Sequence, residues 1–234
     1  MGEARLQAAS SAQARRSGTQ VWKDWRWFAL TLVTLLMLRS LVADWNQVPT
    51  ASMAPTISVG DQIVVDKRAY GLRLPLTEVN LLRWAAPERG DIVTFTSPYD
   101  GRLYVKRVVA VGGDTVSLIG NHLTVNGEAA SYSTASKQSP PGYRAVEERL
   151  LGSVRTIQIR RLAPPAHRID IDPMTVPTGQ LLVLGDNRDE SFDSRRFGLI
   201  AASSVLGQAR AVAFSLDYAN GFALRTERRW VGLR

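Results

Sequence analysis

The chain has 234 residues and no cysteine, which excludes structural disulfides, thiolate catalysis and cysteine-ligated zinc. Its formal net charge is +8, yet its lysines and arginines form no compact block with interleaved aromatic residues, which argues against nucleic acid as a partner. The only histidines, His122 and His167, lie in polar stretches typical of a surface, so a Ser-His-Asp triad is disfavoured.

The N-terminal part predicts a membrane anchor. Residues 1–24 are small, polar and basic, and we expect a cytoplasmic tail, although this composition also resembles an organelle transit peptide. Residues 25–45 are predicted to span the membrane, because Trp27–Ala43 reaches the lower length limit and tryptophans bracket it. Arg39 lies near one end, where its guanidinium can reach the headgroups. A cleaved signal peptide or a buried helix is the alternative, and the poor cleavage site at residues 42–44 disfavours the first.

The basic residues before this segment place the N-terminus in the cytoplasm by the positive-inside rule. Everything after residue 45 is then extracytoplasmic. The expected location is the plasma (inner) membrane with a periplasmic domain, and an organellar membrane is the alternative.

The rest of the chain predicts a mostly β domain over residues 46–234, either a barrel or a sandwich. Asn126-Gly127 predicts a tight hairpin turn. Residues 117–180 are expected to be an inserted, irregular subdomain, because Pro-Pro and Pro-Gly stretches interrupt most of it. The expected strands are short segments rich in Val, Ile and Leu at residues 62–70, 91–97, 103–111, 115–120, 122–128, 180–186 and 209–216.

The stretch VPTASMAPTISVGD, residues 48–61, frames a serine with prolines. Pro49 and Pro55 fix their own backbone φ angles and restrict the residues before them, so Ser52 sits in a pre-set loop. Taken alone, an ordinary turn explains this pattern better than chemistry does.

The stretch DGRLYVKRVVAVGGDTV, residues 100–116, places two cations in an apolar strand. Side chains alternate along a strand, so Lys106 and Arg107 point to opposite faces and one of them is directed toward the core. Burial lowers the pKa of a lysine, and a neutral amine can act as a general base for a serine hydroxyl. An edge strand with both cations in solvent is an equally good explanation of this stretch alone.

The stretch VLGDNRDESFDSRRFG, residues 183–198, follows an apolar strand with a dense set of polar residues. Gly185 and Gly198 bound it and suggest tight backbone geometry. A hydrogen-bonded polar network is favoured over a solvated loop.

Together these three stretches resemble the sequence boxes of type I signal peptidases, the membrane-bound Ser/Lys leader peptidases. The first stretch is similar to the family's nucleophile box, the second to its lysine box, and the third to its Gly-Asp-Asn-Arg box. The similarity covers roughly residues 45–116 and 180–215, with the boxes in the family's order behind an N-terminal anchor. Residues 117–180 carry no match, and their role stays open.

The resemblance implies roles for single residues. Ser52 would be the nucleophile and Lys106 the general base. Thr50, where the family usually has serine, would form the oxyanion hole with the Ser52 backbone N–H. Ser191 would orient the Lys106 amine.

The same resemblance implies supporting and substrate-binding residues. Asp193 and Arg195 would brace the third box, and Asp186 would pair with Arg107. Met53 matches the family's residue after the nucleophile and should wall the substrate pocket. The full set expected to bind substrate is Val48, Pro49, Met53, Ile57, Ile63, Tyr104 and Val105.

The expected function is removal of signal peptides from exported preproteins after small-x-small sites. The partners implied are signal peptides and the lipid bilayer; no nucleic acid, cofactor or metal is implied, and we expect a monomer. The alternatives are a specialised maturation peptidase of the same architecture, such as one for a conjugation pilin, and a non-catalytic envelope domain. A self-cleaving repressor-type protease is disfavoured because no DNA-binding domain is visible in the sequence. A class A β-lactamase or penicillin-binding enzyme is disfavoured because the sequence has no Ser-x-x-Lys motif with a Lys-Thr-Gly partner.

Overall fold

The computed structural model describes residues 23, 25–32, 34, 43–73, 80–136, 139–162 and 169–233. Residues 25–32 are helical, and no helix in these ranges is long and apolar enough to cross a membrane. Most of the second half of the predicted anchor, with Arg39, lies outside the described residues, as does His167. Residues 43–45, the predicted end of the anchor, instead belong to a strand, because their backbone pairs with that of residues 64–66.

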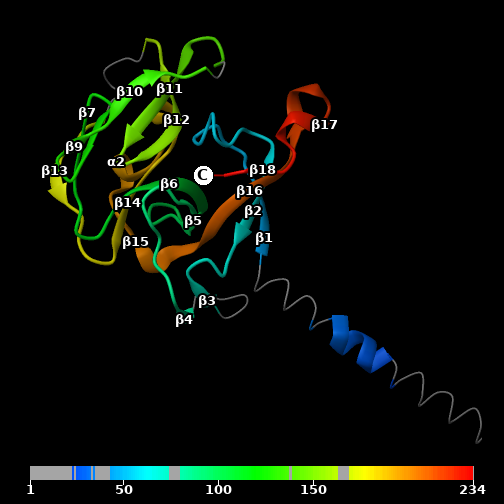
Figure 1. Cartoon of the computed structure of the whole chain (residues 1–234). Helices are drawn as coiled ribbons and strands as arrows, with labels where there is room; N and C mark the ends of the chain where they lie inside the picture. The colour runs from blue at the N-terminus through cyan, green and yellow to red at the C-terminus, as the bar shows by residue number, and fades with distance from the viewer. Residues whose placement is uncertain are drawn as a thin grey trace, which may run out of the picture.

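The described domain is mostly β, as predicted, and its main sheet has nine antiparallel strands (Figure 1). Strand β16 is the longest, and its register slips against both β2 and β5. Such bulges bend a strand, and here they help the sheet to curl on itself. The order is β1 (Ala43–Gln47), β2 (Asp61–Asp66), β16 (Val205–Asp217), β5 (Ile92–Thr96), β6 (Leu103–Val111), β14 (Gln180–Leu184) and β15 (Ile200–Ala201), and β17 (Ala223–Leu224) and β18 (Val231–Gly232) also pair with β16.

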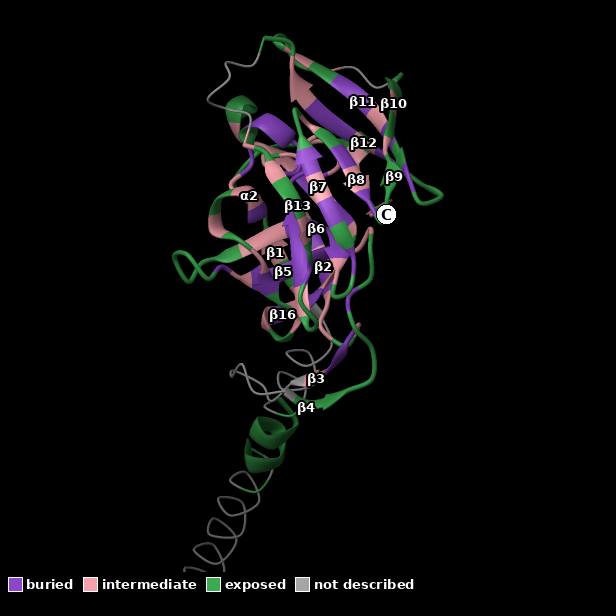
Figure 2. Ribbon diagram, turned by 90° about the vertical axis from the view of Figure 1, so that its left-hand side faces the viewer, coloured by how far each residue is buried: buried purple, intermediate pink, exposed green. Residues whose placement is uncertain are grey.

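Three smaller sheets complete the fold, and two of them lie at the opposite end of the molecule from β3 and β4 (Figures 1 and 2). The hairpin turn between β8 and β9 is at Asn126-Gly127, as predicted, and both residues have positive φ. The strands are β13 (Ile171–Thr175), β7 (Thr115–Ile119), β8 (His122–Val125) and β9 (Glu128–Ala129); β10 (Ser131–Thr134), β11 (Tyr143–Leu150) and β12 (Ser153–Arg160); and β3 (Gly71–Arg73) with β4 (Asn80–Arg83).

The short helices are η2 (Arg188–Glu190), α2 (Ser194–Phe197), η3 (Ala202–Ser204), η4 (Tyr218–Asn220) and η5 (Thr226–Arg228). Of these, η2 and α2 belong to the third polar stretch. They follow β14 directly and bring its charged residues beside β6 and β12.

The insert is regular, contrary to our expectation. Strands β11 and β12 form a hairpin whose register runs without interruption from Tyr143 to Leu150. The sequence pattern concealed it, because Glu148 and Arg155 occupy inward positions where apolar residues are usual. These two residues lie opposite each other in the ladder, so their charges neutralise one another inside the fold.

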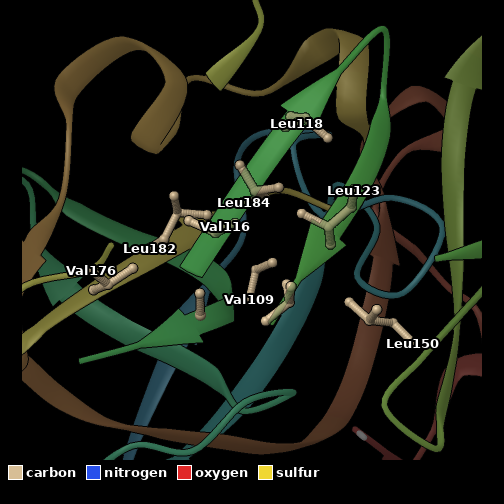
Figure 3. Close-up of a cluster of buried hydrophobic side chains, with 10 residues drawn as sticks. Val109, Val116, Leu118, Leu123, Leu150, Val176, Leu182 and Leu184 are labelled. Atoms are coloured by element: carbon tan, nitrogen blue, oxygen red, sulfur yellow. The ribbon is translucent and has the colours of Figure 1, made fainter. Parts of the chain in front are cut away.

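The core joins the insert to the main sheet. Figure 3 shows one apolar cluster that collects Val109 of β6, Leu184 of β14, Leu123 of β8 and Leu150 of β11. Figure 2 shows the same distribution as buried stretches on strands of both regions. The insert is therefore packed against the strands that carry the candidate site.

Candidate active site

The loop between β1 and β2 presents a serine. Ala54 N–H donates to the Ala51 carbonyl at 3.0 Å, and Ile57 N–H donates to the Met53 carbonyl at 2.9 Å, so the chain turns tightly around Ser52. Met53 is buried, whereas Ser52 itself is half-buried. The loop therefore anchors its apolar side chains in the core and leaves the hydroxyl accessible.

Strand β6 brings a buried lysine to this hydroxyl. Lys106 Nζ lies 2.8 Å from Ser52 Oγ and donates to the Val105 carbonyl at 3.0 Å, and only 4% of Lys106 is exposed. The ring of Tyr104 lies 5.3 Å from the same nitrogen. Burial lowers the pKa of Lys106 to about 8 from 10.5, and although Asp193 and Asp186 act in the opposite direction, desolvation dominates.

Both cations of β6 are buried, whereas alternation alone required only one. On the Lys106 face of β6, Val108 packs against strands of the main sheet, and on the Arg107 face, Val109 packs against the insert, so both faces are covered. Lys106 lies beside the serine and Arg107 faces the other side. Arg107 Nε and Nη2 each lie 2.8 Å from an Asp186 carboxylate oxygen, which is the pair that the sequence predicted. Asp186 also accepts a hydrogen bond from Thr56, so this carboxylate links β6 to the nucleophile loop.

The segment after β14 holds the serine loop through backbone contacts. Asn187 N–H donates to the Ser52 carbonyl at 3.1 Å, and Asn187 Nδ2 donates to the Ala51 carbonyl at 3.1 Å. A Cβ atom on Gly185 would stand 2.4 Å from the Ser52 carbonyl oxygen and 2.2 Å from Ser191 Oγ. Only glycine allows this approach.

Asp193 and Arg195 brace the third stretch. Asp193 caps α2 and accepts hydrogen bonds from Arg195 Nε at 2.8 Å and from Gly185 N–H at 3.0 Å. Burial opposes ionisation of Asp193, but Arg195 and the Gly185 N–H outweigh it and lower the pKa of this carboxyl. Arg195 Nη2 also donates to the Arg188 carbonyl, which links α2 back to η2 within the same stretch.

Ser191 does not orient the lysine as expected. Its Oγ is buried, and in the described part of the chain no hydrogen bond joins it to Lys106. After Arg195 and the Gly185 N–H, the Ser191 hydroxyl is a further group that lowers the pKa of Asp193. Lys106 Nζ instead forms its hydrogen bonds with Ser52 Oγ and the Val105 carbonyl. Thr50 Oγ1 lies 3.4 Å from Ser52 Oγ, and its role in an oxyanion hole stays a prediction.

A cleft of about 310 Å³ opens over Ser52 and Lys106. The predicted Val48, Pro49, Met53, Tyr104 and Val105 line it. The chain on either side of it comes from the end of β1 and the start of β6. The other lining residues are Asn46, Gln47, Thr50, Ser52, Arg102, Leu103, Lys106, Glu190 and Phe192.

Ile57 and Ile63, which were also expected to bind substrate, lie in the core. Both are fully buried in the core cluster that also contains Met53, and neither lines the cleft. Ile63 points inward because of the alternation along β2, and the Met53–Ile57 turn directs Ile57 the same way.

The sequence also missed cleft residues that carry no motif signal. Asn46 and Gln47 belong to strand β1, and Phe192 lies between η2 and α2. Elsewhere, His122 is exposed, in agreement with its expected surface position. Within the described ranges, no group of three or more His, Asp or Glu side chains could hold a metal ion.

The family described as Signal peptidase, peptidase S26, matches residues 22–214. The chain belongs to this family. Signal peptidase I of Pseudomonas aeruginosa is 35% identical over 210 residues, which cover 80% of this chain and 70% of the relative. Signal peptidase I of Pseudomonas fluorescens is 33% identical over 201 residues, with the same coverage. A crystal structure of a signal peptidase I from Enterococcus faecalis is 30% identical, covers 52% of this chain and 95% of its own, and gives a TM-score of 0.33.

The signal peptidase match contains the whole candidate site. Ser52, Lys106 and the segment from Gly185 to Arg195 all fall inside residues 22–214. The match also spans the insert, for which the sequence boxes predicted no role.

Proposed function

We propose that this chain is a membrane-anchored serine endopeptidase that removes N-terminal signal peptides from exported preproteins after small-x-small sites. The observation that carries the proposal is the 2.8 Å contact between Ser52 Oγ and a buried Lys106 Nζ, in a cleft of a chain that belongs to the signal peptidase family. A serine and a lysine at hydrogen-bond distance form a nucleophile and base pair without histidine.

The first step is acylation. Neutral Lys106 takes the proton of Ser52 as the serine oxygen attacks the carbonyl carbon of the scissile peptide bond. Thr50 Oγ1 and the Ser52 N–H stabilise the oxyanion that forms. Lys106 then gives the proton to the leaving amine, and the acyl group stays on Ser52 as an ester.

The second step is hydrolysis of that ester. Lys106, neutral again, takes a proton from a water that attacks the acyl carbon, and the proton returns to Ser52 as the ester breaks. The face of the Tyr104 ring lies 5.3 Å from the lysine nitrogen and favours its transient charge.

The cleft supports recognition of an extended peptide. Backbone at Asn46–Pro49 and at Leu103–Val105 lies on its two sides, and a strand-like substrate can pair with such edges. Val48, Met53 and Val105 leave an apolar space near Ser52, which suits small side chains at alternate substrate positions.

The proposed anchor is the apolar segment before β1, so that the N-terminus is cytoplasmic and the β domain extracytoplasmic. The support is the hydropathy of residues 25–42 and the basic residues that precede it. Strand β1 begins at Ala43, which shortens the segment by three residues relative to the sequence prediction.

The test is cleavage of a preprotein with an Ala-x-Ala site by the full chain in detergent. Ser52→Ala and Lys106→Ala should each lower the rate by at least about a thousandfold, because each removes one half of the nucleophile and base pair. Ser133→Ala and Lys67→Ala are matched controls outside the cleft and should cleave at the normal rate. Near-normal cleavage by either active-site variant would refute the assignment, and circular dichroism would show that both remain folded.

A further inference from the structure

Strand β12 of the insert forms hydrogen bonds with residues 186–190, the segment that contacts the nucleophile loop. Gln158 N–H of β12 donates to the Asp186 carbonyl at 2.8 Å, and Arg160 N–H donates to the Asp189 carboxylate at 2.8 Å. Gln158 and Asn187 also form an isolated parallel bridge. The start of this segment therefore pairs with β12 at Asn187, and its helix η2 is joined to Arg160 of the same strand through Asp189.

A buried charge cluster reinforces this contact. Glu148 of β11 is fully buried and accepts two hydrogen bonds from Arg188, at 2.8 and 2.6 Å, so the guanidinium is held in two directions. Arg155 of β12 donates to the same carboxylate. Burial opposes ionisation of Glu148, but Arg188 and Arg155 outweigh it and lower its pKa to about 2.

Arg188 is adjacent in sequence to the residue that contacts the nucleophile loop. Asn187 donates hydrogen bonds to the carbonyls of Ala51 and Ser52, as described above, and the next residue, Arg188, is bound to Glu148. In the described part of the chain, no hydrogen bond joins Glu148 to Ser52 or Lys106. A chain of direct contacts instead leads from Glu148 through Arg188 and its neighbour Asn187 to the nucleophile loop.

We infer that Glu148 is a positioning residue: through Arg188 and Asn187, the β11–β12 insert sets the place of Ser52 relative to Lys106. The insert is then a working part of the site and not a passive addition. This inference rests on the proposed peptidase function. A serine displaced by a fraction of an ångström from its base loses rate. Most of the substrate affinity should remain, because much of the cleft is lined by the end of β1 and the start of β6, which Asn187 does not contact.

The experiment compares Glu148→Gln with wild type in single-turnover cleavage of the same preprotein, with the full chain in excess. Glutamine keeps the shape of Glu148 and removes its charge. The single-turnover rate constant should fall about tenfold to a hundredfold. The enzyme concentration at half-saturation should stay within about twofold, and the pH of half-maximal rate should not move, because Lys106 keeps its surroundings.

Glu147→Gln is the matched control. Glu147 is the neighbouring residue on β11 and pairs with Arg149 at the surface at 3.0 Å, so the same substitution there should leave both constants unchanged.

A purely structural role for Glu148 gives a different result. Loss of folded enzyme raises the concentration at half-saturation and leaves the rate constant at saturation unchanged, and that outcome would overturn the inference. If Glu148→Gln does not fold, Arg188→Lys, which keeps every charge and removes only the two-pronged contact, is measured in the same way with the same two outcomes. Absence of cleavage by wild type would instead contradict the proposed function.

Discussion

At the scale of the residue, the central fact is the environment of Lys106. A lysine in water is a poor general base at neutral pH because almost all of it is protonated. Here the strand β6 places the amine where 4% of the residue is exposed, and desolvation brings its pKa to about 8. A substantial fraction of the amine is therefore neutral in mildly alkaline solution, which is the form that can take a proton from Ser52.

We predict that kcat/KM for preprotein cleavage rises with pH and levels off above about pH 8. The sign follows from the mechanism, since the protonated lysine is inactive and its deprotonation in the free enzyme governs kcat/KM. Below the inflection the rate should fall about tenfold per pH unit. The measurement is kcat/KM from pH 6 to 10 with a folded-state check at each point. A maximum on the acid side would contradict a lysine base.

At the scale of the element, β6 is stabilised from its second face. Arg107 and Asp186 are both almost fully buried and form a two-pronged ion pair between β6 and the end of β14. Removing one partner of such a pair leaves the other charge without compensation in a desolvated place. The pair thus fixes β6 at Arg107, the residue next to Lys106, which we propose as the general base.

We predict that Arg107→Met lowers the free energy of unfolding by about 3–5 kcal/mol, because it leaves the Asp186 carboxylate buried and unpaired. Chemical denaturation at neutral pH measures this loss. Arg149→Met is the matched control: its ion pair with Glu147 is solvent-exposed, and its removal should change the free energy of unfolding by less than about 1 kcal/mol. Equal effects of the two substitutions would contradict the assigned importance of burial.

The sequence could predict the elements that carry chemistry but not the contacts that position them. Ser52 and Lys106 could be proposed as the site only through the resemblance of three stretches to the signal peptidase boxes, because each of their own two stretches alone fitted an ordinary turn or an exposed strand at least as well. The hydrogen bonds from Asn187 to backbone carbonyls depend on no partner side chain, and no pattern marks them. The β11–β12 hairpin was missed for a related reason, since its inward Glu148 and Arg155 break the apolar alternation by which a strand is recognised.

At the scale of the whole molecule, the mostly β architecture was predictable because short apolar segments with turn residues between them have few other solutions. The curl of the main sheet was not, since it arises from register slips along β16 that only the paired structure reveals. Both cations of β6 are inside because the main sheet packs on one face of that strand and the insert packs on the other.

We predict that the molecule crosses the membrane once, with the β domain outside. Protease added to intact spheroplasts should degrade residues 46–234, because the basic N-terminal tail is retained in the cytoplasm. A tag placed before residue 25 should stay protected until the membrane is permeabilised. A protected β domain in intact spheroplasts would refute this orientation.

The buried amine has a consequence for the energetics of folding. In the unfolded chain Lys106 would have its ordinary pKa of 10.5, whereas in the folded chain its pKa is about 8, so below pH 8 the folded state must hold a charged group away from water. The penalty amounts to about 3 kcal/mol below pH 8, shrinks between pH 8 and 10.5, and vanishes above that range. This residue therefore disfavours the folded state at every pH below 8, neutral pH included, and the apolar clusters must offset a desolvation penalty that a methionine in the same place would not impose.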